Sequence, residues 1–484
     1  MDITLILRTV QYLRPTQVWH QVKYRVFKAK YKALEAPAFI VPTLKSFPIP
    51  RYHCLKGERF CFLNLEHDFA GWQFADLGNL WLYNQNYFDW LNQPGMTAEE
   101  GCKWIDRFIG VTSGMAMDPY PIALRSINWV KFFCRYPETA TNTRVNALWS
   151  QLKLLERKLE YHLLANHLLE DAYALYIGAS FFSDRRLMDK ARCLLKKQLA
   201  EQILPDGGHY EQSAMYHCIL LDRLLDCINI HAESWMEPIA AKMVGWLKSI
   251  CYRDGSFPLM NDAAEGIAPT PKQIFDYAER LGVVSEPKRL CESGYRRLVN
   301  ERMEATVDLG NVTASYQPGH THADALSYEL RIDGHPFVID TGISTYNKTE
   351  RRQLERSTVS HNCVSPDGRN SSEVWGGFRV GQRAKVKIVS EDSNAVEALH
   401  DGFGKPCRRR FYMDNSEFTI EDWYGGEAVS YIHLAEGVDL SRLTIDGVIR
   451  VVENDWNYST EYNRFHDGSV VEILFKNHLK YKIK

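Results

Sequence analysis

Residues 326–339 read LSYELRIDGHPFVI, and this stretch decides the architecture of the second half of the chain. Apolar residues from Leu326 to Ile332 alternate with polar ones, as expected for a strand with one buried face. The Asp333-Gly334 pair then separates this run from a second apolar run, a combination typical of a β-hairpin.

More strand-like runs follow the hairpin at 384–389, 410–412, 417–420, 449–452 and 470–475. No helical pattern lies between them. Strands that succeed one another without helices favour an antiparallel β-sandwich.

Before about residue 300 the apolar spacing is helical. Leu148, Leu152, Leu155 and Leu159 recur at steps of four, three and four, which places them on one helix face. Short Gly/Pro turns separate similar runs, as in stacked helical hairpins. Because 484 residues exceed one ordinary domain, we predict a body of stacked helical hairpins over 1–302 and a β-sandwich over 303–484.

The composition is that of a soluble globular protein, with 45% hydrophobic and 24% charged residues. The formal net charge of −2 provides no overall field that would hold nucleic acid, so we expect none as a partner. The eleven cysteines form no CxxC pair, and Cys193 and Cys227 lie in apolar helical runs. We therefore expect buried, reduced thiols.

The N-terminal region shows no signal peptide, because the apolar run 3–7 stops at Arg8. No apolar run reaches the roughly 18 residues of a membrane-spanning helix. These features predict a cytoplasmic protein without a transmembrane segment. The basic segment 8–32 contains Trp19 and Tyr24 and suits peripheral contact with an anionic membrane. A solvated first helix is the simpler interpretation.

The densest cluster of polar residues is PGHTHAD at 318–324, which holds His320 and His322. Asp340 and His361 follow downstream. Two histidines and one carboxylate are sufficient protein ligands for zinc. In a turn, one histidine can bind metal while the other faces a substrate. The alternative is that these histidines are polar surface residues in loops.

The stretch ANHLLE at 165–170 places His167 and Glu170 three residues apart, on one helix face. The carboxylate can orient the imidazole, and Asn166 can hydrogen-bond a ligand. The alternative is that Asn166 is only the N-cap of a helix.

The stretch GGHYEQSAMYH at 207–217 brings His209, Tyr210 and Tyr216 to the start of a helix. Tyr216 is a candidate acid or base, because a phenol desolvated near cations can change its protonation. His209 and Tyr210 are candidate substrate contacts. The alternative is that the rings only pack on a neighbouring helix.

The stretch PYPIALRSINW at 119–129 places Arg125 and Asn128 on one face of a helix that starts with proline. Arginine binds a carboxylate or sulfate through two parallel hydrogen bonds, so both residues are candidate substrate contacts. Otherwise Arg125 is a surface residue. Arg356, near Arg352 and Arg379, is a further candidate contact in the β part.

These blocks, together with LWLYNQNYFD at 80–89, HTHADALSYEL at 320–330 and RSTVSHNCV at 356–364, resemble the heparinase II/III family in order and over most of the chain. The basic N-terminus is similar to that of members from bacterial surface-polysaccharide gene clusters. The resemblance implies an incomplete α/α toroid followed by antiparallel β-sheets. It also implies a polysaccharide lyase that cleaves a uronic-acid-containing glycan by β-elimination.

The resemblance further implies roles for single residues. Tyr216 and His320 would form the acid–base pair. Asn166 and His167 would neutralise the uronate carboxylate, and Glu170 would be a further active-site carboxylate. Zinc, in a mainly structural role, would be bound by three residues: His322, Asp340 and His361.

Two other functions stay open at this point. A glycoside hydrolase on the same scaffold needs paired carboxylates, and Glu170, Glu211 and Asp262 are available. A non-catalytic protein of surface-polysaccharide assembly would bind an acidic glycan without turnover. The sugar, the linkage and the oligomeric state do not follow from the sequence.

Overall fold

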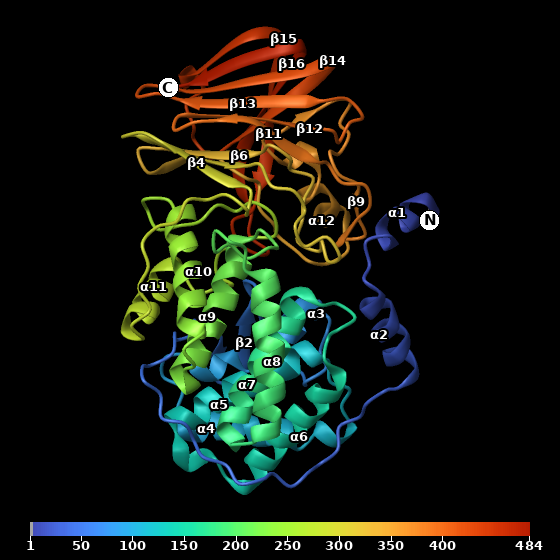
Figure 1. Ribbon diagram of the computed structural model, residues 1–484, viewed down its shortest axis with the longest axis vertical. Helices are drawn as coiled ribbons and strands as arrows, with labels where there is room; N and C mark the ends of the chain where they lie inside the picture. The colour runs from blue at the N-terminus through green and yellow to red at the C-terminus, as the bar shows by residue number, and fades with distance from the viewer. Residues whose placement is uncertain (1–2) are drawn as a thin grey trace.

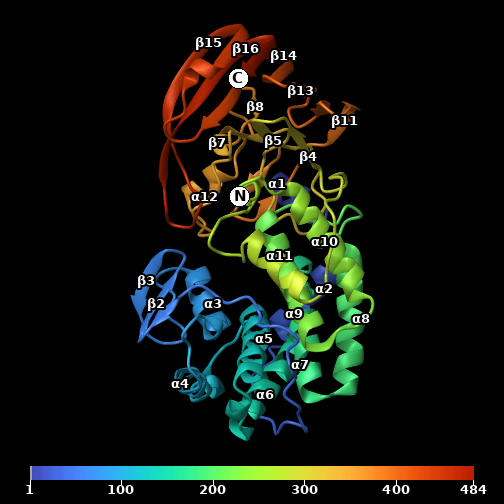
Figure 2. The same cartoon turned by 90° about the vertical axis from the view of Figure 1, so that its left-hand side faces the viewer.

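The computed structural model describes residues 3–484, and Figure 1 shows a helical body on one side of a large β-sheet. The helices of the body are α3 (Asn79–Tyr87), α4 (Ala98–Ile109), α5 (Pro119–Arg135), α6 (Asn142–Lys158), α7 (Ala165–Phe182), α8 (Arg185–Gln202), α9 (Ala214–His231), α10 (Met236–Ile250) and α11 (Pro271–Arg280). A helical region followed by a curled antiparallel sheet confirms the predicted fold class (Figure 2).

The central helices of the body are α5 and α7, which are buried around most of their circumference. A helix that is apolar on all sides belongs in the middle of an assembly. Pro119 starts α5, where its fixed backbone angle and missing N–H suit the first turn. The predicted leucine face lies on α6, where Leu148, Leu152 and Leu155 are fully buried.

Three short strands interrupt the helical part: β1 (Leu55–Lys56), β2 (Arg59–Phe62) and β3 (Leu65–Asp68) form an antiparallel sheet. The expectation of an all-helical first part is therefore incomplete. Strands of two to four residues are too short for alternation to reveal them. Phe60 of β2 packs edge-on against Trp90 and Trp104, which attaches this sheet to the helices.

The large sheet has eleven strands, and neighbouring strands run antiparallel. They are β4 (Tyr295–Val299), β5 (Met303–Asp308), β6 (Tyr328–Ile332), β7 (His335–Val338), β8 (Val364–Ser365), β11 (Val386–Glu391), β12 (Ala395–His400), β13 (Cys407–Met413), β14 (Phe418–Leu434), β15 (Leu443–Tyr458) and β16 (His466–Ile483). The helix α12 (Glu350–Glu355) and the hairpin of β9 (Val374–Trp375) and β10 (Arg379–Val380) lie beside it.

The predicted hairpin is formed by β6 and β7, with Ile332 paired to His335. Asp333 and Gly334 have φ angles of 52° and 81°, the left-handed conformation that a two-residue hairpin turn requires. The predicted strands 449–452 and 470–475 are segments of the much longer β15 and β16.

The change from helices to sheet occurs between Arg280, where α11 ends, and Tyr295, where β4 begins. The sheet therefore starts ahead of the predicted division at residue 303. The eleven cysteines are unpaired, but Cys193 is exposed rather than buried as predicted. Between residues 3 and 484, no helix combines the length and apolar character needed to cross a bilayer.

Candidate active site

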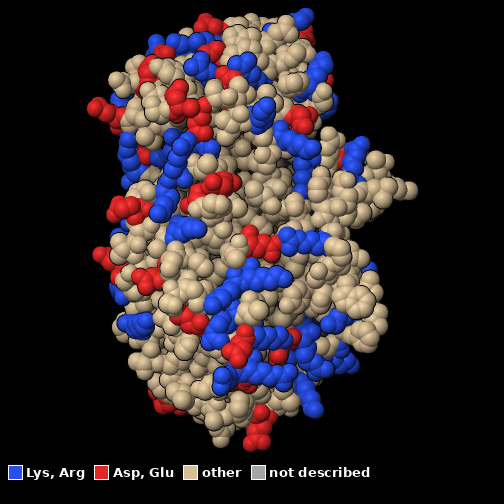
Figure 3. Space-filling view, viewed as in Figure 1, with Lys and Arg blue, Asp and Glu red and all other residues tan. Residues whose placement is uncertain are grey.

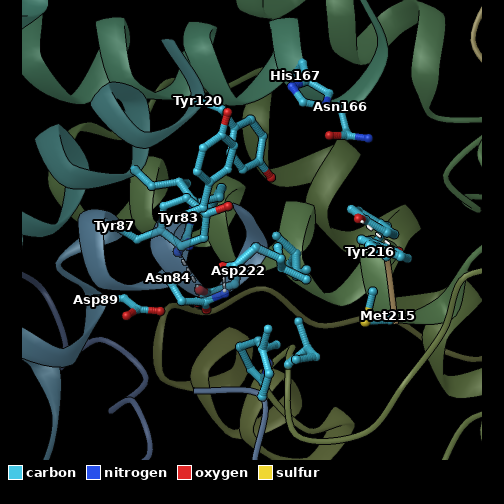
Figure 4. A pocket seen from close by; sticks show the side chains of 18 of the residues that line it. Tyr83, Asn84, Tyr87, Asp89, Tyr120, Asn166, His167, Met215, Tyr216 and Asp222 are labelled. Carbon is cyan, nitrogen blue, oxygen red and sulfur yellow. Dashed lines mark hydrogen bonds and ion pairs between the residues drawn. The ribbon is translucent and has the colours of Figure 1, made fainter. Parts of the chain in front are cut away.

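A cavity of about 740 Å³ lies where loops of the helical body meet loops of the β part. Side chains of α3, α5, α7 and α9 line it together with residues of the segments 317–320 and 346–348. In Figure 4, Tyr83, Tyr87 and Tyr120 lie across the cavity from Tyr216. Aromatic rings with polar edges are suitable platforms for sugar rings, so the cavity suits a carbohydrate.

Tyr216 and His320 are brought together in this cavity from parts of the chain that are far apart. Tyr216 stands in the first turn of α9, where Ser213 caps the helix by accepting from the Tyr216 backbone N–H. The ring centroids of Tyr216 and His320 are 4.0 Å apart, with 31° between the ring planes. Burial raises the pKa of Tyr216 above its ordinary value, so the free protein presents a neutral phenol.

Asp262 orients the imidazole of His320. Its Oδ2 lies 2.8 Å from Nδ1 of His320, and Arg352 holds both carboxylate oxygens at 2.5 and 2.7 Å. Although burial opposes the charge, Arg352 and the two histidines bound to Asp262 hold the pKa of this carboxyl well below its usual range. The ionised carboxylate accepts a hydrogen bond from an N–H at Nδ1, which favours the tautomer in which Nε2 of His320 carries the free lone pair.

Nε2 of His320 faces the start of α7. It lies 3.4 Å from Nδ2 of Asn166 and 3.6 Å from Oε2 of Glu211. Glu211 accepts from both the backbone N–H and the side-chain amide of Asn166, at 3.1 and 2.8 Å. Asn166 stands inside α7 rather than at its N-cap, and Leu164 and Ala165 before it have left-handed φ angles of 64° and 53°. This entry turn aims the amide into the cavity.

His167 lies beside Asn166 and has a raised pKa. Its ring packs 4.7 Å from the ring of Tyr120, and its Nδ1 lies 3.2 Å from Oε2 of Glu160. Although burial opposes a charge, Glu160 raises the pKa of His167, with smaller contributions from Glu211 and Glu170. An imidazolium at this position can bind the carboxylate of an acidic sugar.

Replacing Glu160 by glutamine should change the pH dependence of binding. His167 is charged below its raised pKa and loses that charge as the pH rises through it. Without Glu160 the pKa falls, so KM for an acidic oligosaccharide should begin to rise at a lower pH. At the pH where only the variant has lost the charge, the rise should be about tenfold. KM measured against pH tests this.

The matched control for this variant is Glu156→Gln on α6, a carboxylate that is paired with Lys190 at 3.0 Å and does not line the cavity. Its KM profile should coincide with that of the unmodified protein. Coinciding profiles for Glu160→Gln would show that His167 does not bind the acidic group.

Glu170 lies behind the cavity wall rather than in it. Its side chain is fully buried, neither carboxylate oxygen has a hydrogen-bond partner, and Arg223 approaches to 3.5 Å. Burial raises the pKa of Glu170 to about 7, against the opposing effect of Arg223. Because Arg223 lines the cavity, Glu170 can act on a ligand only through that guanidinium.

Asn128 is the one predicted substrate contact of five that lines the cavity. Arg125 instead points into the helical core, where it donates to Gln151 and to the carbonyl of Asn86. Arg356 is fully buried and donates to the carbonyl of Thr321. The prediction that these two arginines bind substrate is therefore wrong. Inside the protein, fixed backbone and side-chain acceptors take the place of the water molecules that would otherwise hydrogen-bond these two guanidinium groups.

His209 and Tyr210 are also buried away from the cavity, so their predicted substrate contacts are wrong. Nε2 of His209 lies 3.0 Å from Oε1 of Gln202, and burial holds the pKa of this imidazole well below its ordinary value. The hydroxyl groups of Tyr210 and Tyr316 are 2.8 Å apart, which ties the loop before α9 to the β part.

The three predicted zinc ligands are neighbours but do not surround one point. Nδ1 of His322 and Nε2 of His361 face each other at 3.2 Å. Asp340 instead contacts the far nitrogen of His361, with its Oδ2 2.8 Å from Nδ1. Within residues 3–484, no three His, Cys, Asp or Glu side chains are gathered in a metal-binding arrangement. The histidines fit a shared metal, whereas Asp340 fits a role in orienting His361.

Several residues that line the cavity were not predicted from the sequence. Tyr83, Asn84 and Tyr87 line the cavity from one face of α3, and their i, i+1, i+4 spacing was the available signal. The cavity also holds the cations Arg51, Lys131, Arg223 and Lys348. No local pattern distinguishes these from surface cations, because loops and helices far apart in the chain bring them together.

A helical body followed by a curled antiparallel sheet is the fold of heparinase III. The chain belongs to the heparinase II/III-like family. The Heparinase II/III N-terminus model matches residues 130–278, and the Heparinase II/III-like, C-terminal model matches residues 283–472.

Individual relatives are distant. A heparin-sulfate lyase of Bacteroides thetaiotaomicron is 21% identical over 326 residues, which are 56% of this chain and 45% of the relative. The chain thus matches about half the length of that protein. A heparinase III crystal structure superposes with a TM-score of 0.63 at 14% identity, over 85% of this chain and 78% of the other. Heparan sulfate lyase HepC from Pedobacter heparinus gives 0.55 at 14% identity, over 96% and 87%. These structures establish the fold alone.

Proposed function

We propose that this protein is a polysaccharide lyase that cleaves a uronic-acid-containing glycan by β-elimination. The observation that carries the proposal is the contact of Tyr216 with His320 inside the cavity, with Nδ1 of His320 held by Asp262. This arrangement supplies a neutral phenol as an acid and a free imidazole nitrogen as a base at one place. An elimination needs such an acid and such a base before it starts.

In the proposed reaction, Nε2 of His320 removes the C5 proton of the uronate. The electron pair of the broken C5–H bond forms the C4=C5 double bond, and the C4–O bond breaks. Tyr216 gives its proton to the departing C4 oxygen. His167, as imidazolium, and the amide of Asn166 stabilise the negative charge that develops on the carboxylate. No water is consumed.

The short distance between the rings of Tyr216 and His320 favours one C5 configuration of the uronate over the other. A pyranose ring does not fit between ring centroids 4.0 Å apart, so Tyr216 and His320 reach the sugar from one side. This suits a uronate whose C5 hydrogen and C4 oxygen lie on the same face, as in glucuronate. An iduronate would need the acid and the base on opposite faces.

Glycoside hydrolysis is less well supported. None of its candidate carboxylates, Glu170, Glu211 and Asp262, lines the cavity. Asp262 is fixed by Arg352, and Glu211 by Asn166. Paired carboxylates of a hydrolase must reach the scissile bond from both sides, and these three do not.

A panel of glucuronate and iduronate polymers tests the proposal through ultraviolet absorbance and product mass. We expect unsaturated products from a glucuronate polymer, with product masses that sum to the substrate mass. A gain of one water per cleavage would make the protein a hydrolase. Binding of the polymer without any turnover would instead indicate a glycan-binding or assembly protein.

Zinc bound mainly by His322 and His361 is a second proposal. Two nitrogens about 2.0–2.1 Å from one tetrahedral zinc lie about 3.4 Å apart, close to the 3.2 Å between these imidazoles. The metal would fix the loop that carries His320 and would take no part in bond breaking.

We expect about one zinc per chain in protein purified without chelators, and a lower Tm after chelation. His361→Gln should lose the metal. His400→Gln, which changes a buried histidine outside this group, should retain it. Metal-free protein whose Tm does not respond to zinc or chelator would contradict the proposal.

A further inference from the structure

The N-terminal helix α2 (Pro15–Val26) packs on the protein with its polar side. The side chain of Gln17 donates to the carbonyl groups of Leu163 and Tyr316, both at 3.2 Å. The hydroxyl of Tyr24 donates to the carbonyl of Leu159 at 2.5 Å. A surface helix ordinarily does the reverse, burying its apolar side and exposing its polar side.

The apolar side of α2 therefore faces outward. Trp19 is 65% exposed and Val22 is 51% exposed. The helix is exposed to solvent, as the simpler interpretation expects, but the side that it exposes is largely apolar. The same flank of the molecule carries α1 (Ile3–Val10) in Figure 1. Together the two helices and the residue after α2 expose one set of large apolar side chains: Ile3, Leu7, Val10, Val18, Trp19, Val22, Val26 and Phe27.

This set, which we term the apolar flank, is fixed to the rest of the protein. Arg8 pairs with Glu373, and the indole N–H of Trp375 donates to Thr9 at 3.0 Å. The guanidinium of Arg383 stacks 3.7 Å from the ring centre of Tyr12. These contacts hold the polar sides of the helices inward, so the flank cannot cover itself by rotating.

Positive charge surrounds the apolar flank. Residues 1–32 contain seven Lys and Arg and one Asp, a net charge of 7 − 1 = +6 in a chain whose total is −2. The exposed cations next to the flank are Arg25, Lys28, Lys30 and Lys32. In Figure 3, uncharged surface lies beside blue patches on this side of the molecule. A second copy of the chain would meet the same positive charge, which opposes self-association through this surface.

We propose that the apolar flank docks the protein onto the surface of an anionic lipid bilayer. Tryptophan and branched side chains enter the boundary between headgroups and acyl chains, while lysines and arginines bind the anionic headgroups. Gln17 contacts the carbonyl of Leu163, and Leu163 lines the cavity. The docked protein would thus hold the cavity close to the membrane. The docking itself does not depend on the reaction proposed above.

Cosedimentation of the full chain with phosphatidylcholine vesicles, with and without phosphatidylglycerol, tests the proposal. We expect binding to the anionic vesicles only. The double variant Trp19→Glu, Val22→Glu should bind at least about tenfold more weakly. The matched control is Ile449→Glu, Val451→Glu on β15, where the replaced side chains are 54% and 44% exposed. The control should bind like the unmodified protein.

Unchanged circular dichroism and Tm would show that both double variants are folded, as exposed positions should allow. Absence of binding to anionic vesicles would overturn the proposal, as would equal binding by the α2 variant and the unmodified chain. Light scattering that shows a dimer broken by the α2 variant, without vesicle binding, would identify a second copy as the occupant and would also overturn it.

Discussion

Replacing Tyr216 by phenylalanine should lower kcat for unsaturated-product formation by about 10²–10⁴-fold, the usual contribution of a positioned acid or base. The variant keeps the aromatic ring, which packs 4.0 Å from His320, so the imidazole should stay in place. KM should change little, because the phenol proton is needed when the C4–O bond breaks and not before. Initial rates of ultraviolet absorbance against substrate concentration separate the two effects.

Tyr210→Phe is the matched control, since both tyrosines belong to one sequence block. The Tyr210 hydroxyl lies 2.8 Å from that of Tyr316, outside the cavity, and Tyr316 also donates to Glu201. Its removal should cost about 1 kcal/mol of stability and leave kcat unchanged. Full turnover by Tyr216→Phe would remove this phenol from the mechanism, and a large kcat loss in Tyr210→Phe would transfer the role to Tyr210.

The parts of the fold that the sequence predicted are those with local causes. The hairpin of β6 and β7 follows from alternation and from a pair that tolerates left-handed backbone, Asp333-Gly334. The small sheet β1–β3 has no comparable signal in its short strands. In β15 most residues are exposed, so burial does not impose an alternation that could mark its full length.

The candidate active site, like the fold, could be predicted only where the cause lies in the local sequence. The sequence places Arg125 and Asn128 on one helix face, but it does not determine which neighbouring residue each side chain contacts. Arg125 donates hydrogen bonds to Gln151 and to the carbonyl of Asn86 in the core, whereas Asn128 lines the cavity. The histidines and tyrosines in Gly-rich sequence blocks could be recognised from the sequence as candidate catalytic residues. The groups that orient them are common acidic residues, and only tertiary structure relates them to their partners.

Asp262→Asn should have the second large effect, because Asp262 positions His320 without touching the substrate. The carboxylate accepts a hydrogen bond from Nδ1–H, with 2.8 Å between Nδ1 and Oδ2, and so leaves Nε2 free. An amide in its place can offer an N–H to Nδ1 and favour the other tautomer, with the proton on Nε2. A comparable change at a triad aspartate elsewhere costs about 10⁴ in kcat. We expect a loss of about 10²–10⁴ in kcat, with a smaller change in KM.

Loss of stability has to be separated from loss of positioning, since Arg352 would be left buried beside a neutral amide, a change that can cost about 3–5 kcal/mol. Asp422→Asn is the matched control. Arg409 holds Asp422 at 2.6 and 2.9 Å in an equally buried pair of the β core, outside the cavity. Both variants should have a lower Tm, but only Asp262→Asn should lose kcat per folded molecule at a temperature where each is folded. If the two variants lose kcat equally, Asp262 contributes only stability, and another group must hold the proton on Nδ1 of His320.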